Sequence, residues 1–117
     1  MEKATILYAD GSANSYLLTP KPEPQIEYSP VKPEFSSTGT YDGGEPVTRK
    51  ISREQHQRIL EAVRAALENK AVHIKDRIKM SGLVRVKTDE GEVTVILTPG
   101  CAEQKALEQA LKQSLQP

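Results

Sequence analysis

The pattern of apolar and polar positions predicts a β-hairpin at the start of the chain. Residues 4 to 8 and 15 to 19 have the character of short strands, and Asp10-Gly11 stands between them. An Asp-Gly pair between two such segments is a strong signal for a tight turn. We expect a hairpin that either extends a larger sheet or reaches a neighbouring chain.

Residues 20 to 34 are predicted to be a proline-rich connector. Its first prolines stand at alternate positions and have no backbone N–H to donate, which favours extended polyproline geometry. Ile26 and Tyr28 follow in an extended stretch that Pro30 and Pro33 interrupt. Because proline is tolerated mainly on sheet edges, this stretch is expected to form an edge strand or an irregular crossing.

The clearest helix begins after Ser52. Ser52 and Gln55 have the spacing of a capping box, and the following apolar residues recur at helical spacing. The helix should end near Asn69-Lys70. A short strand, Val47 to Ile51, is expected to lead into it.

Alternating residues then predict further strands. Residues 72 to 80 suggest one or two short strands, and residues 83 to 88 and 93 to 97 suggest an antiparallel hairpin. Thr98-Pro99 has the pattern of a helix start, with Thr98 as N-cap, and a second amphipathic helix should run to the end of the chain.

Together these elements predict an α+β fold, an antiparallel β-sheet with two α-helices packed on one face and an N-terminal β-hairpin. We expect a single domain over residues 1–117, made of the hairpin (1–19), the connector (20–34) and a β-α-β-β-α body (35–117). With one Phe and no Trp, the core is predicted to be aliphatic. Leu7 and Leu17 are counted among its members.

Composition narrows the classes of function. The chain has 16 basic and 16 acidic residues, so it lacks the excess of positive charge that is typical of nucleic-acid binders. The N-terminal residues lack a long apolar segment, and no apolar run approaches the length of a membrane span. The single cysteine fits a reducing compartment, and we expect a cytoplasmic protein without membrane contact.

Few residues suggest chemistry. Cys101 would lie in the first turn of the second helix, where the helix dipole favours a thiolate, so it is the candidate for a reactive thiol. His56 and His73 have no metal-ligand spacing and are predicted to be surface residues. We expect no catalytic residue, no metal and no cofactor.

The loop that precedes the first helix is the candidate binding surface. Its glycines leave backbone N–H groups accessible, and its hydroxyl groups and aromatic ring suit a contact with a protein or peptide. A plain structural turn is the alternative interpretation. The candidate residues are Thr40, Tyr41, Asp42, Gly43 and Gly44.

Residues 34 to 116 resemble the emfourin family of small proteinaceous inhibitors of thermolysin-like metalloproteases. The resemblance lies in the order of the elements and in Gly43-Gly44, which matches part of a Ser-Gly-Gly-Phe-Ala-Gly-like motif; the aromatic residue and third glycine after it are missing here. The resemblance implies that Thr40 to Gly44 would form the inhibitory surface.

The sequence thus favours a small non-catalytic interaction module that binds a protein. That protein partner could also be a second copy of this chain, in a homodimer. The alternatives are an inhibitor of a thermolysin-like metalloprotease and a thiol-dependent enzyme or redox sensor that uses Cys101. A less favoured third class is a nucleic-acid-binding domain, for which steeply salt-dependent binding is expected. It would use Arg49, Lys50, Arg53, Arg58 and Arg64.

Overall fold

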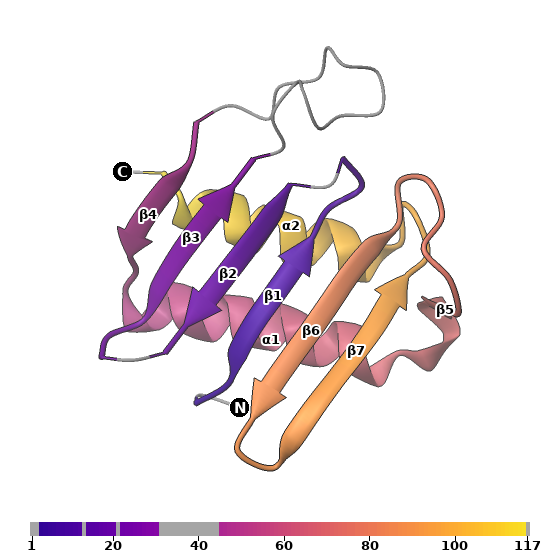
Figure 1. Cartoon of the computed structure of the whole chain (residues 1–117), viewed down its shortest axis with the longest axis horizontal. Helices are drawn as coiled ribbons and strands as arrows, with labels where there is room; N and C mark the ends of the chain where they lie inside the picture. The colour runs from indigo at the N-terminus through magenta and orange to yellow at the C-terminus, as the bar shows by residue number, and fades with distance from the viewer. Residues whose placement is uncertain (1–2, 13, 21, 31–44, 117) are drawn as a thin grey trace.

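The computed structural model describes residues 3–12, 14–20, 22–30 and 45–116. These residues form two layers, a 7-stranded antiparallel sheet and a pair of helices that covers one of its faces (Figure 1). This is the predicted α+β architecture. Neither helix within these ranges has the length and apolar character that crossing a lipid bilayer requires.

The elements follow one another in the order strands, helix, strands, helix. The strands are β1 (Thr5–Ala9), β2 (Ser15–Thr19), β3 (Gln25–Ser29), β4 (Val47–Lys50), β5 (His73–Ile74), β6 (Gly82–Thr88) and β7 (Gly91–Leu97). The helices are α1 (Arg53–Glu68) and α2 (Ala102–Ser114), with a short 3-10 turn, η2 (Lys70–Val72), after α1.

The N-terminal hairpin lies in the middle of the sheet. The strand order is β4-β3-β2-β1-β6-β7-β5, so β1 has β2 on one side and β6 on the other. Ile6 lies opposite Leu18 in the first pair and opposite Val86 in the second. The hairpin therefore extends the sheet of its own chain, the first of the two arrangements expected from the sequence.

The connector contains a strand with two neighbours, which corrects the expectation of an edge strand. β3 pairs with β2 along its whole length and with β4 on its other side. Pro24 and Pro30 stand immediately outside the strand, at positions where no ladder hydrogen bond is lost. The prolines thus delimit β3 and do not weaken it.

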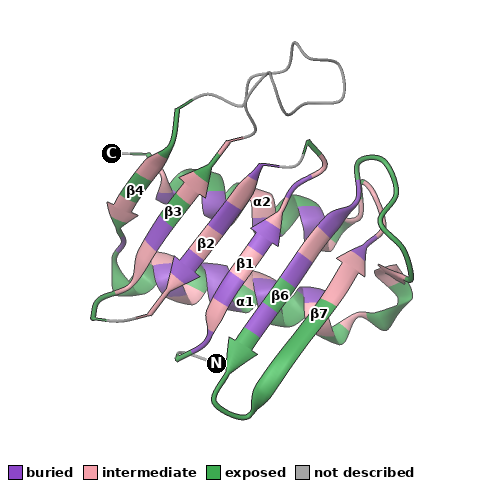
Figure 2. Cartoon of the chain, in the orientation of Figure 1, coloured by how far each residue is buried: buried purple, intermediate pink, exposed green. Residues whose placement is uncertain are grey.

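Buried and less buried residues alternate along β1 and β2 (Figure 2), as expected when successive side chains point to opposite faces of the sheet. Ile6 and Tyr8 on β1 and Tyr16 and Leu18 on β2 are buried, whereas the residues between them are half-buried. The core is mainly aliphatic, as predicted, but it also contains two tyrosines, because Tyr8 and Tyr16 are 0% and 3% exposed. Tyrosine is accepted in a core when its hydroxyl group has a hydrogen-bond partner.

Leu7 and Leu17 do not belong to the helix-covered core, contrary to the prediction. They lie directly opposite each other on β1 and β2, on the face that carries no helix. Successive residues of a strand point to opposite faces, so a strand with apolar residues in sequence must place one of them on each side.

The first helix begins as predicted. Ser52 Oγ accepts from the backbone N–H of Gln55, and Gln55 Oε1 accepts from the backbone N–H of Ser52, which completes the capping box. Ile59 and Val63 are fully buried against the sheet, and Asn69 caps the C-terminal end. Local sequence signals therefore set both ends of α1.

The second helix begins later than predicted. Cys101 is its N-cap, and Thr98 instead donates its backbone N–H to the carbonyl oxygen of Val72 at 2.8 Å, next to the β5–β7 pairing. Gly100 has φ +75°, a left-handed conformation that interrupts a helix at this point. The strands predicted over residues 72 to 80 are also shorter than expected, because only β5 forms there and residues 75 to 80 lie outside the sheet. Met80 has φ 69°, a left-handed conformation that is incompatible with a strand at this point.

Candidate functional site

The predicted binding loop lies outside the described residues. This applies to Thr40, Tyr41, Asp42, Gly43 and Gly44, so the loop, and with it the metalloprotease-inhibitor hypothesis, stays a prediction. The basic residues Arg53, Arg58 and Arg64 are exposed along α1, and Lys50 on β4 pairs with Glu23 at 3.4 Å.

Cys101 does not meet a catalytic partner among the described residues. As the N-cap of α2 it is half-buried, and its side chain makes no capping hydrogen bond. A ring nitrogen of His73 lies 2.6 Å from the carbonyl oxygen of Ala66, so the imidazole of His73 is hydrogen-bonded to the backbone of α1. No hydrogen bond joins the thiol to a described histidine, so this part of the chain holds no thiol–imidazole pair.

His56 is buried, which corrects its prediction as a surface residue. It is 5% exposed and lies one turn before Ile59 and Leu60 on the core side of α1. The described part of the chain contains no group of three or more His, Cys, Asp or Glu residues that could hold a metal ion.

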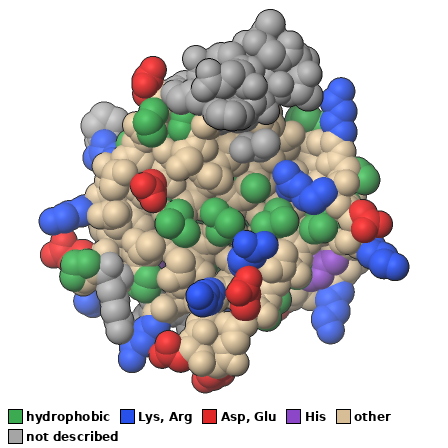
Figure 3. Space-filling view, in the orientation of Figure 1, with side chains coloured by type: hydrophobic (Ala, Val, Ile, Leu, Met, Phe, Trp, Pro, Cys, Tyr) green, Lys and Arg blue, Asp and Glu red, His purple; other side chains and the backbone are tan. Residues whose placement is uncertain are grey.

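The face of the sheet without helices carries an apolar band, which we call the open face. Leu17 lies opposite Leu7, and Leu83 lies opposite Ala9 on one side and Ile96 on the other. These residues connect β2, β1, β6 and β7 without interruption. Figure 3 shows apolar side chains in a band across the middle of this face.

Charged side chains of both signs lie around the band. Arg85 stands opposite Leu7, and Glu27 stands opposite Leu17. Arg85 Nε lies 3.1 Å from a carboxylate oxygen of Glu92, and both side chains are about half exposed, at 45% and 48%. An antiparallel sheet can expose one face to water, but its apolar band then remains available for contact.

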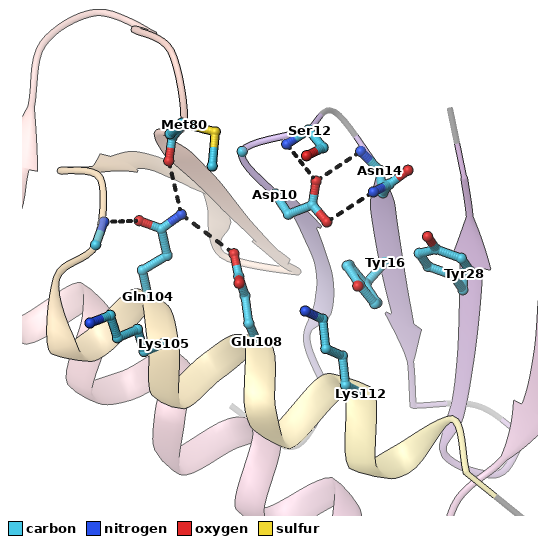
Figure 4. Close-up of a pocket in the computed structure, with 12 residues that line it drawn as sticks. Asp10, Ser12, Asn14, Tyr16, Tyr28, Met80, Gln104, Lys105, Glu108 and Lys112 are labelled. Carbon is cyan, nitrogen blue, oxygen red and sulfur yellow. Dashed lines mark hydrogen bonds between the residues drawn. The ribbon is translucent and has the colours of Figure 1, made fainter. Parts of the chain in front are cut away.

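A cavity of about 440 Å³ lies at one end of the interface between sheet and helices, and we call it the end pocket (Figure 4). Its walls come from the turn between β1 and β2, from β3, from the loop before β6 and from α2. The lining includes Asp10, Asn14, Tyr16, Tyr28, Met80, Gln104, Lys105, Glu108 and Lys112.

The turn between β1 and β2 is built around the Asp10 carboxylate. One carboxylate oxygen accepts the backbone N–H groups of Ser12 and Asn14 at 2.9 and 3.0 Å, and the other accepts the Asn14 side-chain amide at 3.2 Å. Aspartate commonly stabilises turns by bonding to the backbone just after it. This carboxylate therefore serves the local structure of the hairpin.

A second polar network joins β1 to α2. The Tyr8 hydroxyl donates to Glu108 at 2.5 Å, and Gln104 donates to the same carboxylate oxygen at 3.4 Å and to the Met80 carbonyl oxygen at 3.2 Å. Burial raises the pKa of the Tyr8 hydroxyl far above its ordinary value, and the adjacent Glu108 acceptor raises it further. Tyr8 is therefore a neutral hydrogen-bond donor at neutral pH.

The end pocket was missed in the sequence because its residues are far apart in the chain. Tyr8, Tyr16 and Tyr28 stand opposite one another on three adjacent strands, and Lys105, Glu108 and Lys112 share one side of α2. The spacing of the α2 residues, by three and four positions, was the available signal. The spacing of the α2 residues does not show that tyrosines on the strands lie next to them.

Comparison of the chain with models of known protein families, with curated proteins and with solved structures finds no significant match.

Proposed function

We propose that this protein is a non-catalytic interaction module that binds a protein partner through the open face of its sheet, and that the partner is a second copy of the chain. The observation that carries the proposal is the continuous apolar band over four neighbouring strands with no covering layer among the described residues. A single cysteine agrees with a reducing compartment such as the cytoplasm.

The dimensions of the open face suit a stable protein interface. With about 4.8 Å between strands and about 3.4 Å per residue, a 7-stranded sheet whose strands average 5 residues offers a flat area of roughly 500 Å². Projecting side chains make the accessible surface larger than this. The area is thus of the same order as the roughly 800 Å² that each partner buries in a standard interface.

The charges on the open face favour a second copy as the partner. Glu27 and Glu92 bring negative charge, while Arg85 and Lys87 bring positive charge to the same face. A surface with both signs does not repel its own copy, and the whole chain has a formal net charge of zero. Face-to-face packing of two sheets also allows the apolar bands to interdigitate.

The experiment is a measurement of mass by light scattering over a series of protein concentrations. We expect the mass to rise towards twice the 12.9 kDa of one chain as concentration increases. Leu17→Glu should keep the protein at monomer mass, because it places a charge within the band, directly opposite Leu7. A wild-type protein that remains monomeric at the highest concentration it tolerates would overturn the proposal.

Val93→Glu is the matched control. Val93 is an apolar residue of β7 that is already 53% exposed, and it points to the opposite side of the strand from the band. This variant should dimerise like the wild type. Circular dichroism spectra of both variants must match the wild type, and equal loss of dimer in the two variants would count against the open face as the interface.

A further inference from the structure

The end pocket has no role in the proposed dimer, yet it has the size and the lining of a ligand-binding site. Its volume of about 440 Å³ falls within the range of roughly 300 to 1,000 Å³ that is common for small-molecule sites. It lies between the sheet and α2, so dimerisation through the open face would leave it accessible. Its charged and aromatic groups indicate which ligands would fit.

The two acidic groups of the pocket already have internal partners. Asp10 accepts three hydrogen bonds within its own turn, and Glu108 accepts from Tyr8 and Gln104. Gln104, only 5% exposed, is held in place because its carbonyl oxygen accepts the backbone N–H of Gly100 at 3.2 Å. This side of the pocket is therefore preorganised by bonds within the protein.

The two basic groups have no such partners among the residues that the structure describes. Lys105 and Lys112 both line the pocket, and neither forms an ion pair with a described residue. Figure 4 shows the Lys112 side chain rising from α2 towards Tyr16 and the Asp10 turn. The charged hydrogen-bond donors that remain available to a ligand are thus the two lysine ammonium groups, although the pocket contains acids and bases in equal number.

Aromatic rings form the wall of the pocket on the sheet side. The rings of Tyr16 and Tyr28 have centroids 4.9 Å apart and are tilted by 45°. Tyr16 is 3% exposed and is supported from behind by Tyr8, whose ring centroid is 6.0 Å away. Tyr28 is half-buried, so part of its surface can contact a planar ligand.

We propose that the end pocket binds a small molecule in which a planar ring carries an anionic group, a carboxylate or a phosphate. Lys112 binds the anionic group, Lys105 contributes positive charge at the mouth, and the planar ring packs against Tyr28. Charge-assisted hydrogen bonds from lysine and contact with an aromatic face are the interactions that this combination of groups supplies.

The test is a ligand titration of the 117-residue chain, followed by NMR chemical shifts. Benzoate and phenyl phosphate are the two ring-bearing anions, and their relative affinity distinguishes a carboxylate from a phosphate ligand. Benzyl alcohol has a ring without the charge, while acetate and inorganic phosphate have the charge without the ring. We expect at least one ring-bearing anion to bind about tenfold more tightly than each of these controls.

Two pairs of variants assign the binding to the pocket. Lys112→Gln should weaken binding by about tenfold, whereas Lys87→Gln, which removes a lysine on the open face, should leave it unchanged. Tyr28→Leu should weaken binding and Tyr28→Phe should retain it. Lys112 is exposed on α2, so its substitution should leave the melting temperature unchanged.

Three results would overturn the proposal: no binding of either ring-bearing anion, equal binding of a control that lacks the ring or the charge, or full affinity in Lys112→Gln. Leu17→Glu separates this proposal from the proposed dimer. It should abolish the dimer and leave ligand affinity unchanged, so the failure of one proposal is visible independently of the other.

Discussion

Leu17 and Leu18 are neighbours on β2, yet they lie in different environments. Leu18 is 0% exposed beneath the helices, whereas Leu17 is half-buried on the open face. The same side chain, on the same strand, is part of the core in one case and part of a contact surface in the other. The position of the helices, and not the residue type, makes the difference.

The polar groups of the two faces differ in the same way. On the covered face Tyr8, Gln104 and Glu108 satisfy one another in a buried network that links strand to helix. On the open face Arg85 and Glu92 form a pair that is about half exposed, and such surface pairs contribute only about 0 to 1 kcal/mol. The covered face is therefore specialised for stability, and the open face is available for contact.

The largest effect on stability is expected from truncating Leu18, and Leu17 is the matched comparison. Leu18→Ala should lower the free energy of unfolding by about 3 kcal/mol, because it leaves a cavity in a packed core. Leu17→Ala should lower it by less than about 1 kcal/mol. Urea unfolding measured at low protein concentration, where any dimer dissociates, gives both values. Equal losses would contradict the distinction between the faces.

Gly82→Ala tests how tightly the covered face is packed. A Cβ atom at Gly82 would lie 2.8 Å from the Tyr8 hydroxyl oxygen and 3.2 Å from the Gln104 amide nitrogen. We expect a loss of about 2 kcal/mol in the free energy of unfolding from this crowding. In a Tyr8→Phe background, which removes the hydroxyl, the additional loss should fall below about 1 kcal/mol. Additive losses would show that the contact with Tyr8 is not the cause.

Tyr8→Phe tests the buried network itself. At neutral pH we expect a loss of about 1 kcal/mol in unfolding free energy, the usual contribution of one hydrogen bond. The raised pKa means that the folded protein holds the Tyr8 proton more tightly than the unfolded chain does. This contribution to stability is complete below the ordinary tyrosine pKa of about 10 and is lost as pH rises above it.

The measurement is chemical unfolding of the wild type and Tyr8→Phe at several values of pH. The wild type should lose stability more steeply than the variant above pH about 10. Parallel curves for wild type and Tyr8→Phe would contradict the role of this hydroxyl.

The smallest effect is expected where α2 begins. Cys101 occupies the N-cap with an extended backbone, φ −69° and ψ 158°, and its side chain forms no capping bond. Cys101→Ser should raise the free energy of unfolding by up to about 0.5 kcal/mol, because a hydroxyl oxygen can accept a backbone N–H of the first turn. Ser52→Ala, which removes the working cap of α1, should lower it by about 1 kcal/mol. A loss in Cys101→Ser would show that the burial of the thiol outweighs capping.

Much of the secondary structure was predictable because its signals are local. The capping box at Ser52, the turn at Asp10 and the alternation in β6 and β7 each depend on residues within a few positions of one another. Predictions failed where a distant contact decided the outcome. Cys101 became the N-cap of α2 because Thr98 bonds to Val72, and β3 gained a second neighbour because β4 returns to it.

The candidate site was less predictable than the fold. The reactive-thiol hypothesis came from one cysteine near an expected helix start, and the binding loop came from glycine and hydroxyl content alone. Neither signal indicates which side chains meet in space. The end pocket brings together Tyr16, Tyr28 and Lys112, and no local pattern connects residues that lie so far apart in the chain.

The sequence alone determines roughly where most of the helices and strands run and which side chains share a face, because backbone preferences and the two periodicities act within each segment. Only the tertiary structure decides which face of the sheet is covered. That choice depends on contacts such as the hydrogen bond between Tyr8 and Glu108, which joins residues 100 positions apart. Docking of the helices on one side turns the apolar side chains of that face into a core and leaves those of the other face as a surface.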